Sequence, residues 1–271
     1  MARMALRPAL RAYAHAPAGA VGHENTLSLV FDGFDEYASS STDVFNSAGA
    51  YTASAWVKMT DETVGGQSIF SITVSGWPAD WHEGRFKLSF SNRTWTTPVV
   101  IGVIAYETTT DAGAETNSGI IFPATPWAEG EWHHIAMTST GDGDAATPCK
   151  LYLDGALVTS WTGVTWSATA PASTIYFLVG VDRNNYHKFN GNIDECAMWT
   201  RELPATGDES IERLFEDGPT DLSVTHSTSL RNWWRMGDPS FDGTTVEDVV
   251  GTSDLTASNM VSGNAVEDVP S

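Results

Sequence analysis

Cysteine is scarce in this sequence, which has only Cys149 and Cys196 among its 271 residues. Two cysteines 47 positions apart cannot form the disulfide framework of a small secreted scaffold, and they match no cysteine spacing of a zinc site. Free cysteine is among the most frequently buried residue types. We therefore expect two buried free thiols, with a single disulfide bridge as the alternative.

Basic residues are also few, with 14 Lys and Arg against 34 Asp and Glu and a formal net charge of −20. Residues 1–23 contain Arg3, Arg7 and Arg11 and no acid, so the remainder holds 11 basic and 34 acidic residues. Nucleic-acid binding requires a basic stripe that neutralises phosphates, and the acidic body argues against that class of function. The three arginines instead predict a partner-binding arm that docks on an acidic neighbour or on another copy.

Long hydrophobic runs are absent: no uninterrupted apolar run of about 18 residues occurs, so we expect no membrane insertion. Residues 1–22 are rich in Ala and Arg, but Arg7, Pro8 and Arg11 interrupt the place where the apolar segment of a signal peptide would lie. We interpret residues 1–25 as an extended N-terminal arm of the mature chain rather than as a secretion signal.

The chain does contain short runs in which apolar and polar residues alternate, separated by clusters of turn residues. Helical periodicity is nearly absent. We expect a β-domain over residues 26–218, with one short helix at Asp208–Phe215, and a different C-terminal extension over residues 219–271. The candidate strands are 27–31, 51–59, 67–74, 85–91, 98–106, 132–139, 149–154, 175–181 and 192–199.

Five strand-like phrases occur in a fixed order, and each alternates apolar and polar residues before a turn: Leu27–Gly33, Tyr51–Lys58, Glu131–Met137, Lys150–Gly155 and Phe189–Glu195. Together they resemble the laminin-G-like branch of the concanavalin A-like lectin/glucanase superfamily. The resemblance implies an all-β fold, an antiparallel jelly-roll β-sandwich. That fold hosts both glycan binders and sugar-cleaving enzymes, so the site residues must decide between them.

The enzymatic alternative depends on the strand that contains Asp194. Retaining glucanases of this superfamily place their carboxylates on one strand so that all of them project into the cleft. Strict alternation gives Asp194 the same face as Asn192, Cys196 and Met198, and it turns Glu195 to the opposite face. Because no second carboxylate then shares the face of Asp194, we predict that the protein is not an enzyme and has no catalytic residues.

A calcium site is the more specific hypothesis for the role of the acidic residues. Asp32 and Asp35 form an acidic turn directly after the first strand, and the resemblance implies that the strand carrying Asp194 lies next to it. Hard cations require several oxygen ligands from adjacent loops. The hypothesis is that Asp32, Asp35 and Asp194 bind one calcium ion; the alternative is that the two turn residues simply cap their own backbone.

Aromatic residues in loops predict a glycan-binding site. Trp77 and Trp81 lie in a turn-rich segment, and Trp95 lies in another loop. Exposed rings offer an apolar face to sugars, and the nearby carboxylates of Asp80 and Glu83 can accept hydrogen bonds from hydroxyl groups. The alternative is that these rings cover the ends of the sandwich or an oligomer interface.

The C-terminal extension contains an adjacent pair of tryptophans, Trp233 and Trp234. The segments Asn232–Asp238 and Gly243–Asp248 resemble the leader that precedes the first core strand in many relatives, although here they follow the last one. Two large apolar side chains must be covered somewhere. We expect the extension to pack on the sandwich or on a neighbouring chain.

Two functions from different classes follow. The first is a bacteriophage virion component, a capsid decoration or tail/fibre protein held by its arms to other virion proteins or to itself as a homo-oligomer. The pairing of such a sandwich with these terminal segments resembles proteins encoded among phage structural genes. The alternative is a glycan-binding module of an extracellular or cell-surface protein. Host surface glycans are candidate partners in both.

Overall fold

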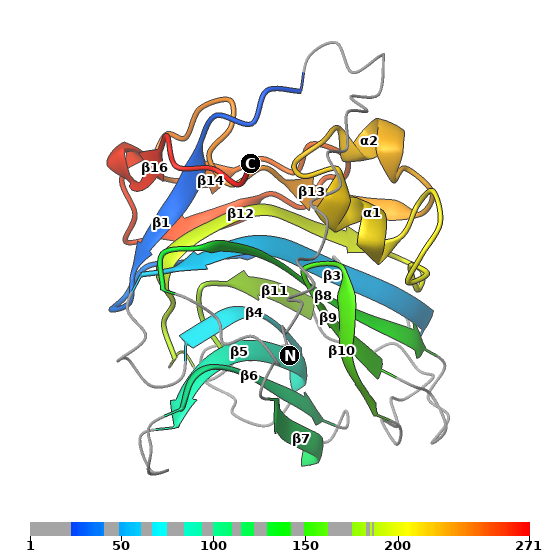
Figure 1. The fold of residues 1–271 in the computed structure, drawn as a ribbon. Coiled ribbons are helices and arrows are strands. Elements are labelled where there is room, and N and C mark those ends of the chain that lie inside the picture. The colour runs from blue at the N-terminus through cyan, green and yellow to red at the C-terminus, as the bar shows by residue number, and fades with distance from the viewer. Residues whose placement is uncertain are drawn as a thin grey trace, which may run out of the picture.

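The computed structural model describes residues 23–40, 49–60, 67–74, 84–93, 100–109, 115–121, 129–141, 149–161, 175–182, 185 and 187–271. Two antiparallel sheets lie face to face, and a layer with two short helices covers the outside of one of them (Figure 1). This arrangement confirms the predicted all-β antiparallel sandwich. None of the helices in the described ranges is long and apolar enough to cross a membrane.

Sheet A has the strand order β10-β9-β8-β3-β12-β1-β16, with β13 also paired to β12. The hairpin between β9 and β10 turns at Asp154 and Gly155, whose φ angles of 49° and 75° are those of a type I′ turn. The strands of sheet A are β1 (Ser28–Asp32), β3 (Gly49–Met59), β8 (Trp132–Gly141), β9 (Cys149–Leu153), β10 (Ala156–Trp161), β12 (Asn190–Trp199), β13 (Leu230–Trp234) and β16 (Ala265–Val266).

Sheet B faces sheet A and has the order β14-β15-β2-β11-β4-β5-β6-β7. Two of its strands, β14 and β15, come from the C-terminal extension, and β15 pairs with β2. The strands of sheet B are β2 (Tyr37–Ser40), β4 (Gln67–Val74), β5 (Gly84–Arg93), β6 (Val100–Thr109), β7 (Glu115–Ile121), β11 (Ile175–Val179), β14 (Thr245–Val246) and β15 (Leu255–Ser258).

The main hydrophobic core fills the space between the sheets. Alternate residues of β3, namely Ala53, Ala55 and Val57, point into it and are fully buried. Phe177 of β11 and Trp234 of β13 stack across the two sheets with ring centroids 4.9 Å apart. Burying each large apolar side chain stabilises the fold by about 1.5–3 kcal/mol, so this layer is the main source of stability.

A second apolar cluster lies on the outer face of sheet A, beneath α1 (Ile211–Glu216) and α2 (Leu222–Thr225). Trp199 and Trp233 form its floor, and Ile211 and Leu214 of α1 cover them. A third short helix, η1 (Ser262–Asn264), precedes β16. The outer face of sheet A is therefore mostly enclosed rather than open to solvent.

The C-terminal extension supplies strands to both sheets of its own chain. Trp234 lies in the main core and Trp233 in the outer cluster, with exposed fractions of 0% and 2%. Cys149 and Cys196 are both buried free thiols, which confirms that prediction. The helix expected at Asp208–Phe215 begins later, at Ile211, because the Ser210 hydroxyl caps it by accepting a hydrogen bond from the Arg213 amide.

Candidate functional site

The turn between β1 and β2 is ordered by its own side chains. The carboxylate of Asp32 accepts hydrogen bonds from the backbone amides of Phe34 and Asp35, at 2.8 and 3.3 Å. Glu36 accepts one from the Asp32 amide at 2.7 Å and one from the Asn264 side chain at 2.8 Å. These bonds fix the turn, which is the capping role considered above for Asp32.

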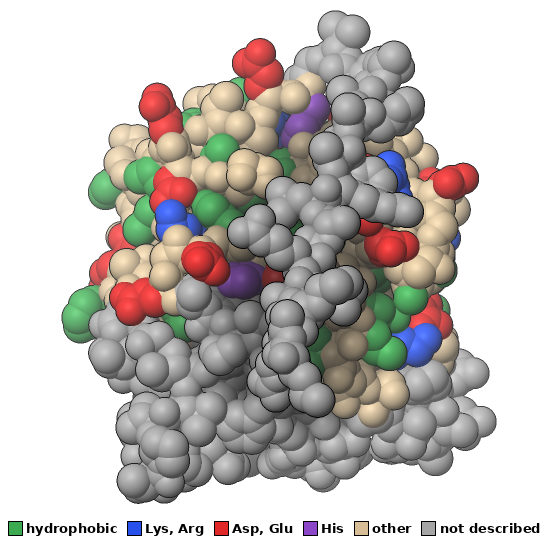
Figure 2. Space-filling model, viewed as in Figure 1, with side chains coloured by type: hydrophobic (Ala, Val, Ile, Leu, Met, Phe, Trp, Pro, Cys, Tyr) green, Lys and Arg blue, Asp and Glu red, His purple; other side chains and the backbone are tan. Residues whose placement is uncertain are grey.

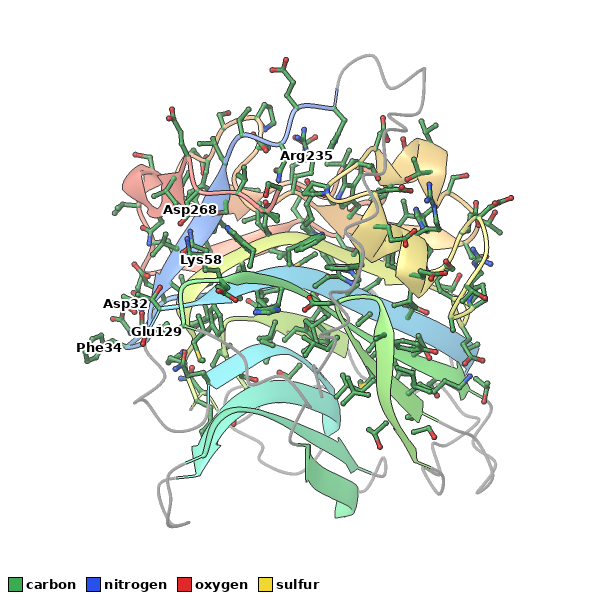
Figure 3. The ribbon with its side chains drawn as sticks, in the orientation of Figure 1. Asp32, Phe34, Lys58, Glu129, Arg235 and Asp268 are labelled. Carbon is green, nitrogen blue, oxygen red and sulfur yellow. The ribbon has the colours of Figure 1, made fainter. Side chains whose placement is uncertain are left out.

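Phe34 stands at the tip of this turn with 82% of its surface exposed. Figure 3 shows the ring pointing outward from the end of β1, beside Asp32. An exposed phenyl ring on a flexible loop would be unremarkable, but here the turn beneath it is held by several hydrogen bonds. The ring is thus a pre-positioned apolar surface, a feature that the sequence analysis did not single out.

The loop between β11 and β12 adds polar groups close to this turn. The buried carboxylate of Asp182 contacts the ring of His187 at 2.5 Å, and the His187 side chain is 43% exposed. The Lys188 ammonium lies 4.1 Å from the centre of the Tyr37 ring. Burial lowers the pKa of Lys188 to about 8, although the charges of Asp182, Asp35 and Asp32 act in the opposite direction.

We call the group formed by Asp32, Phe34, Asp35 and Lys188 the Phe34 rim. It combines an apolar ring, two exposed carboxylates and an ammonium group that can donate hydrogen bonds. Such a combination suits a ligand with an apolar face and several hydroxyl groups. Figure 2 shows that acidic side chains outnumber basic ones among the described residues on the visible face of the molecule.

The third predicted calcium ligand, Asp194, is not near the turn. Asp32 pairs with Asn190 in the β1–β12 ladder, and Asp194 lies four residues further along β12. At about 3.3 Å per residue this is a separation of about 13 Å, too far to share one ion. Within the described ranges, no three acidic, histidine or cysteine side chains are grouped as metal ligands. Calcium binding by the protein stays a prediction.

The faces predicted for Asp194 and Glu195 are wrong. The β12–β3 register shifts between Asp194 and Ala197, and Glu195 has a positive φ of 48°. This bulge places an extra residue in β12, so Ile193 and Cys196 face the core while Asp194 and Glu195 both face outward. A second carboxylate does share the face of Asp194, contrary to the alternation argument.

The two carboxylates are deeply buried, with exposed fractions of 0% for Asp194 and 4% for Glu195. Burial raises the pKa of Glu195 to about 8, although a hydrogen bond from the Trp233 indole at 2.5 Å and the Arg235 charge oppose the shift. Burial, followed by the charge of Glu195, raises the pKa of Asp194 well above its ordinary value. Both shifts favour the protonated acids near neutral pH.

This acid pair has no room for a substrate. A cavity of about 10 Å³ touches Glu195 and is also lined by Ser54, Trp56 and His134. Such a volume holds about one water molecule, whereas ligand pockets measure roughly 300–1,000 Å³. The described environment of Glu195 therefore does not admit a sugar ring between the acids.

The other predicted site residues cannot be placed. The glycan set of Trp77, Asp80, Trp81, Glu83 and Trp95 lies outside the described residues. The arm arginines also lie outside them: Arg3, Arg7 and Arg11.

Comparison with solved structures gives relatives of the same fold. A candidate carbohydrate-binding protein from Bacteroides ovatus superimposes with a TM-score of 0.62 at 15% identity over 92% of this chain. The match spans 62% of that protein's length. The native heptameric SAP-like pentraxin from Limulus polyphemus gives a TM-score of 0.53 at 12% identity, covering 88% of this chain and 98% of the pentraxin.

Sequence comparison identifies the family directly. No curated protein matches the sequence. A family model described as the concanavalin A-like lectin/glucanases superfamily matches residues 31–207, which is more than half of the chain. The match runs from the end of β1, through both sheets, to the segment before α1. The chain therefore belongs to the concanavalin A-like lectin/glucanases superfamily.

Proposed function

We propose that this chain is a non-enzymatic binding protein that recognises carbohydrate at the Phe34 rim. The observation behind the proposal is the 82% exposed phenyl ring on a turn held by hydrogen bonds, with two exposed carboxylates beside it. Membership of a lectin-like superfamily supports it, as does the relative from Bacteroides ovatus that is described as a candidate carbohydrate-binding protein.

The chemistry of the rim suits a sugar. The C–H groups on one face of a pyranose ring pack against an aromatic ring, while hydroxyl groups at its edge donate to carboxylates. Asp32 and Asp35 are the acceptors, and the Lys188 ammonium, which also donates to Asn185 at 2.8 Å, is the donor. The turn loses little conformational entropy on binding because it is already ordered, which favours affinity.

The buried acid pair supports the non-enzymatic part of the proposal. A glycosidase needs two carboxyl groups that reach the scissile bond from a cleft. Asp194 and Glu195 share a face but are enclosed by β13 and by the segment before β1. We therefore assign the pair a structural role.

Replacing Phe34 with alanine should weaken glycan binding at least tenfold without changing the melting temperature. The expected loss reflects removal of the aromatic surface, worth roughly 1.5 kcal/mol or more in a sugar contact. The experiment is a glycan array to find the ligand, followed by calorimetric titration. Leu157→Ala is the matched control, because Leu157 is also an exposed apolar residue, at 53%, but lies on β10 away from the rim.

The same binding experiment can instead favour the glycan-binding residues that the sequence predicts in the loops. If Phe34→Ala binds like the unchanged protein while Trp77→Ala or Trp81→Ala loses binding, the Phe34 rim is wrong and the loop tryptophans hold the ligand. If the protein binds no glycan on the array, carbohydrate recognition itself is wrong.

The virion is the setting that we propose for this binding protein, as a capsid decoration or tail/fibre component. The basic arm with Arg3, Arg7 and Arg11 opposes an acidic body, which suits assembly with other virion proteins or between copies. Mass spectrometry of purified virions should detect the chain at structural stoichiometry. Its absence from the particles would favour the alternative, a glycan-binding module on a cell surface or in the extracellular space.

A further inference from the structure

The segment before β1 lies on sheet A without joining its hydrogen-bond ladder. Residues 23–27, which we call the strap, make no backbone–backbone hydrogen bond among the described residues. Side chains hold the strap instead: Asp194 of β12 and Asp238 and Arg235 after β13 form hydrogen bonds to it, and Glu195 of β12 lies 3.6 Å from His23. The strap is therefore an element that side-chain contacts alone keep in place.

The contacts of the strap converge on those acids. Asp238 accepts hydrogen bonds from the Thr26 amide at 2.8 Å, from the Thr26 hydroxyl at 2.6 Å and from the Leu27 amide at 3.3 Å. The Asn25 side chain donates to Asp194 at 2.9 Å. Arg235 donates to the carbonyl oxygen of Glu24, and Figure 3 shows Arg235 beside this segment.

Glu195 lies at the centre of this arrangement and is imperfectly paired. Its Oε1 atom is 3.6 Å from His23 Nε2 and 3.7 Å from Arg235 Nε, and none of the three buried atoms has a hydrogen-bond partner. These distances exceed a hydrogen bond. Burial lowers the pKa of His23, so its ring is neutral near neutral pH and does not offset a negative charge.

The charged and titratable groups that face Glu195 come from β12, the strap, β8 and the segment after β13. They are Asp194 on β12, His23 of the strap, His134 of β8 across the small cavity, and Arg235 and Asp238 after β13. Burial lowers the pKa of His134 to about 4, so it is also neutral. Arg235 is thus the one cation in this set, and an ionised Glu195 would place a negative charge among buried acids with that single cation to offset it.

We propose that the strap is a proton-controlled latch, which lies on sheet A while Glu195 is protonated and lifts off when Glu195 ionises, with the sandwich still folded. The strap is the part that gives way because β12 is fixed by ladders to β1, β3 and β13. Lifting would hydrate the three acids and free the root of the basic arm.

The direction of the pH effect follows from linkage. With the strap in place the pKa of Glu195 is about 8, and without the strap the carboxyl would be hydrated and ionise near its ordinary value of 4.5. Between those values only the docked form keeps the Glu195 proton, so this group alone weakens docking by up to about tenfold for each unit of rising pH, and loss of a proton from Asp194, whose pKa burial also raises, acts in the same direction. Above about pH 8 the docked form is at its weakest.

Hydrogen exchange of the full chain tests the latch, because the amides of Thr26 and Leu27 donate to Asp238 in the docked form. After correction for intrinsic exchange, their protection should fall at least tenfold between pH 6 and pH 9. Amides of β3 and β12 should keep theirs. Glu195→Gln, which cannot ionise, should keep the strap protected at pH 9, and the control Glu247→Gln, on an exposed residue, should behave like the unchanged chain.

The latch would be overturned by corrected protection that is flat across the pH range, or by a Glu195→Gln variant that loses protection as the unchanged chain does. If Glu195→Gln does not fold, the pH series of the unchanged chain decides alone. The logarithm of corrected protection must then fall with pH, with a slope that reaches at least one power of ten per pH unit, the slope for one proton. A simultaneous loss in β3 and β12 would mean global unfolding and would also overturn the proposal.

Discussion

A chain that ends at Gly218 should not fold cooperatively. The residues removed, 219–271, supply β13 and β16 to sheet A and β14 and β15 to sheet B, so both sheets lose strands at once. Their loss exposes the edges of β1, β12 and β2 together with the core behind them. Unpaired edges beside exposed apolar surface lead to aggregation.

The size of the effect follows from the side chains that the extension buries. Six of its residues belong to the main core and are no more than 7% exposed: Trp234, Met236, Phe241, Val246, Leu255 and Met260. At about 1.5–3 kcal/mol for each large apolar side chain, their removal costs on the order of 9–18 kcal/mol. Domains have a total stability of about 5–15 kcal/mol, so the truncation removes most or all of it.

Circular dichroism, urea titration and size-exclusion chromatography would measure this. The truncated chain should aggregate or show no cooperative transition. Deletion of residues 2–22 is the control, and it should leave the sandwich folded, because the described strands and the strap begin after that segment. A sharp urea transition in the chain ending at Gly218 would show that residues 26–218 form an autonomous sandwich.

The sequence predicted nine strands to within three residues of their observed bounds, including the short β1, β9 and β11, and missed β2, β7, β10 and the four strands of the C-terminal extension. The β4 strand occurs at the predicted residues, 67–74, and β3, β8 and β12 lie within two residues of their predicted bounds. Their long alternating patterns are local signals. By contrast β14 and β16 have two residues each: β16 forms only because the distant β1 offers it an edge, and β14 forms only against β15, which no local pattern records.

The site was less predictable because its geometry depends on tertiary contacts. Strict alternation of faces requires a regular strand, and no residue around Glu195 marks the bulge in β12. The rim joins Phe34 to Lys188 across two separate loops, and only the fold brings them together. Phe34 itself was detectable as an aromatic residue inside an acidic turn, where a core position is unnatural.

Replacing Gly191 with alanine should be the most damaging single methyl addition to the sandwich. Gly191 is in β12, between β1 and β3. Its φ of 146° is one that residues other than glycine rarely adopt. A Cβ at this position would lie 2.1 Å from the backbone oxygen of Lys58 and 3.0 Å from the Cα of Met59. Backbone in the middle of a sheet cannot move aside as a flexible side chain can, so the β3–β12 ladder must open.

The magnitude combines two costs. The unfavourable φ contributes about 1–3 kcal/mol, and each ladder hydrogen bond lost adds about 1 kcal/mol, giving about 4 kcal/mol for Gly191→Ala in urea denaturation. Gly207→Ala separates the two terms, because Gly207 also has a positive φ, 117°, but an added Cβ there meets nothing within 4 Å. Gly207→Ala should lower the free energy of unfolding by the conformational term alone, about 1–2 kcal/mol. Equal losses for the two variants would show that the close approach of Lys58 to β12 contributes nothing, and that the glycine in Asn190–Asn192 serves backbone conformation alone.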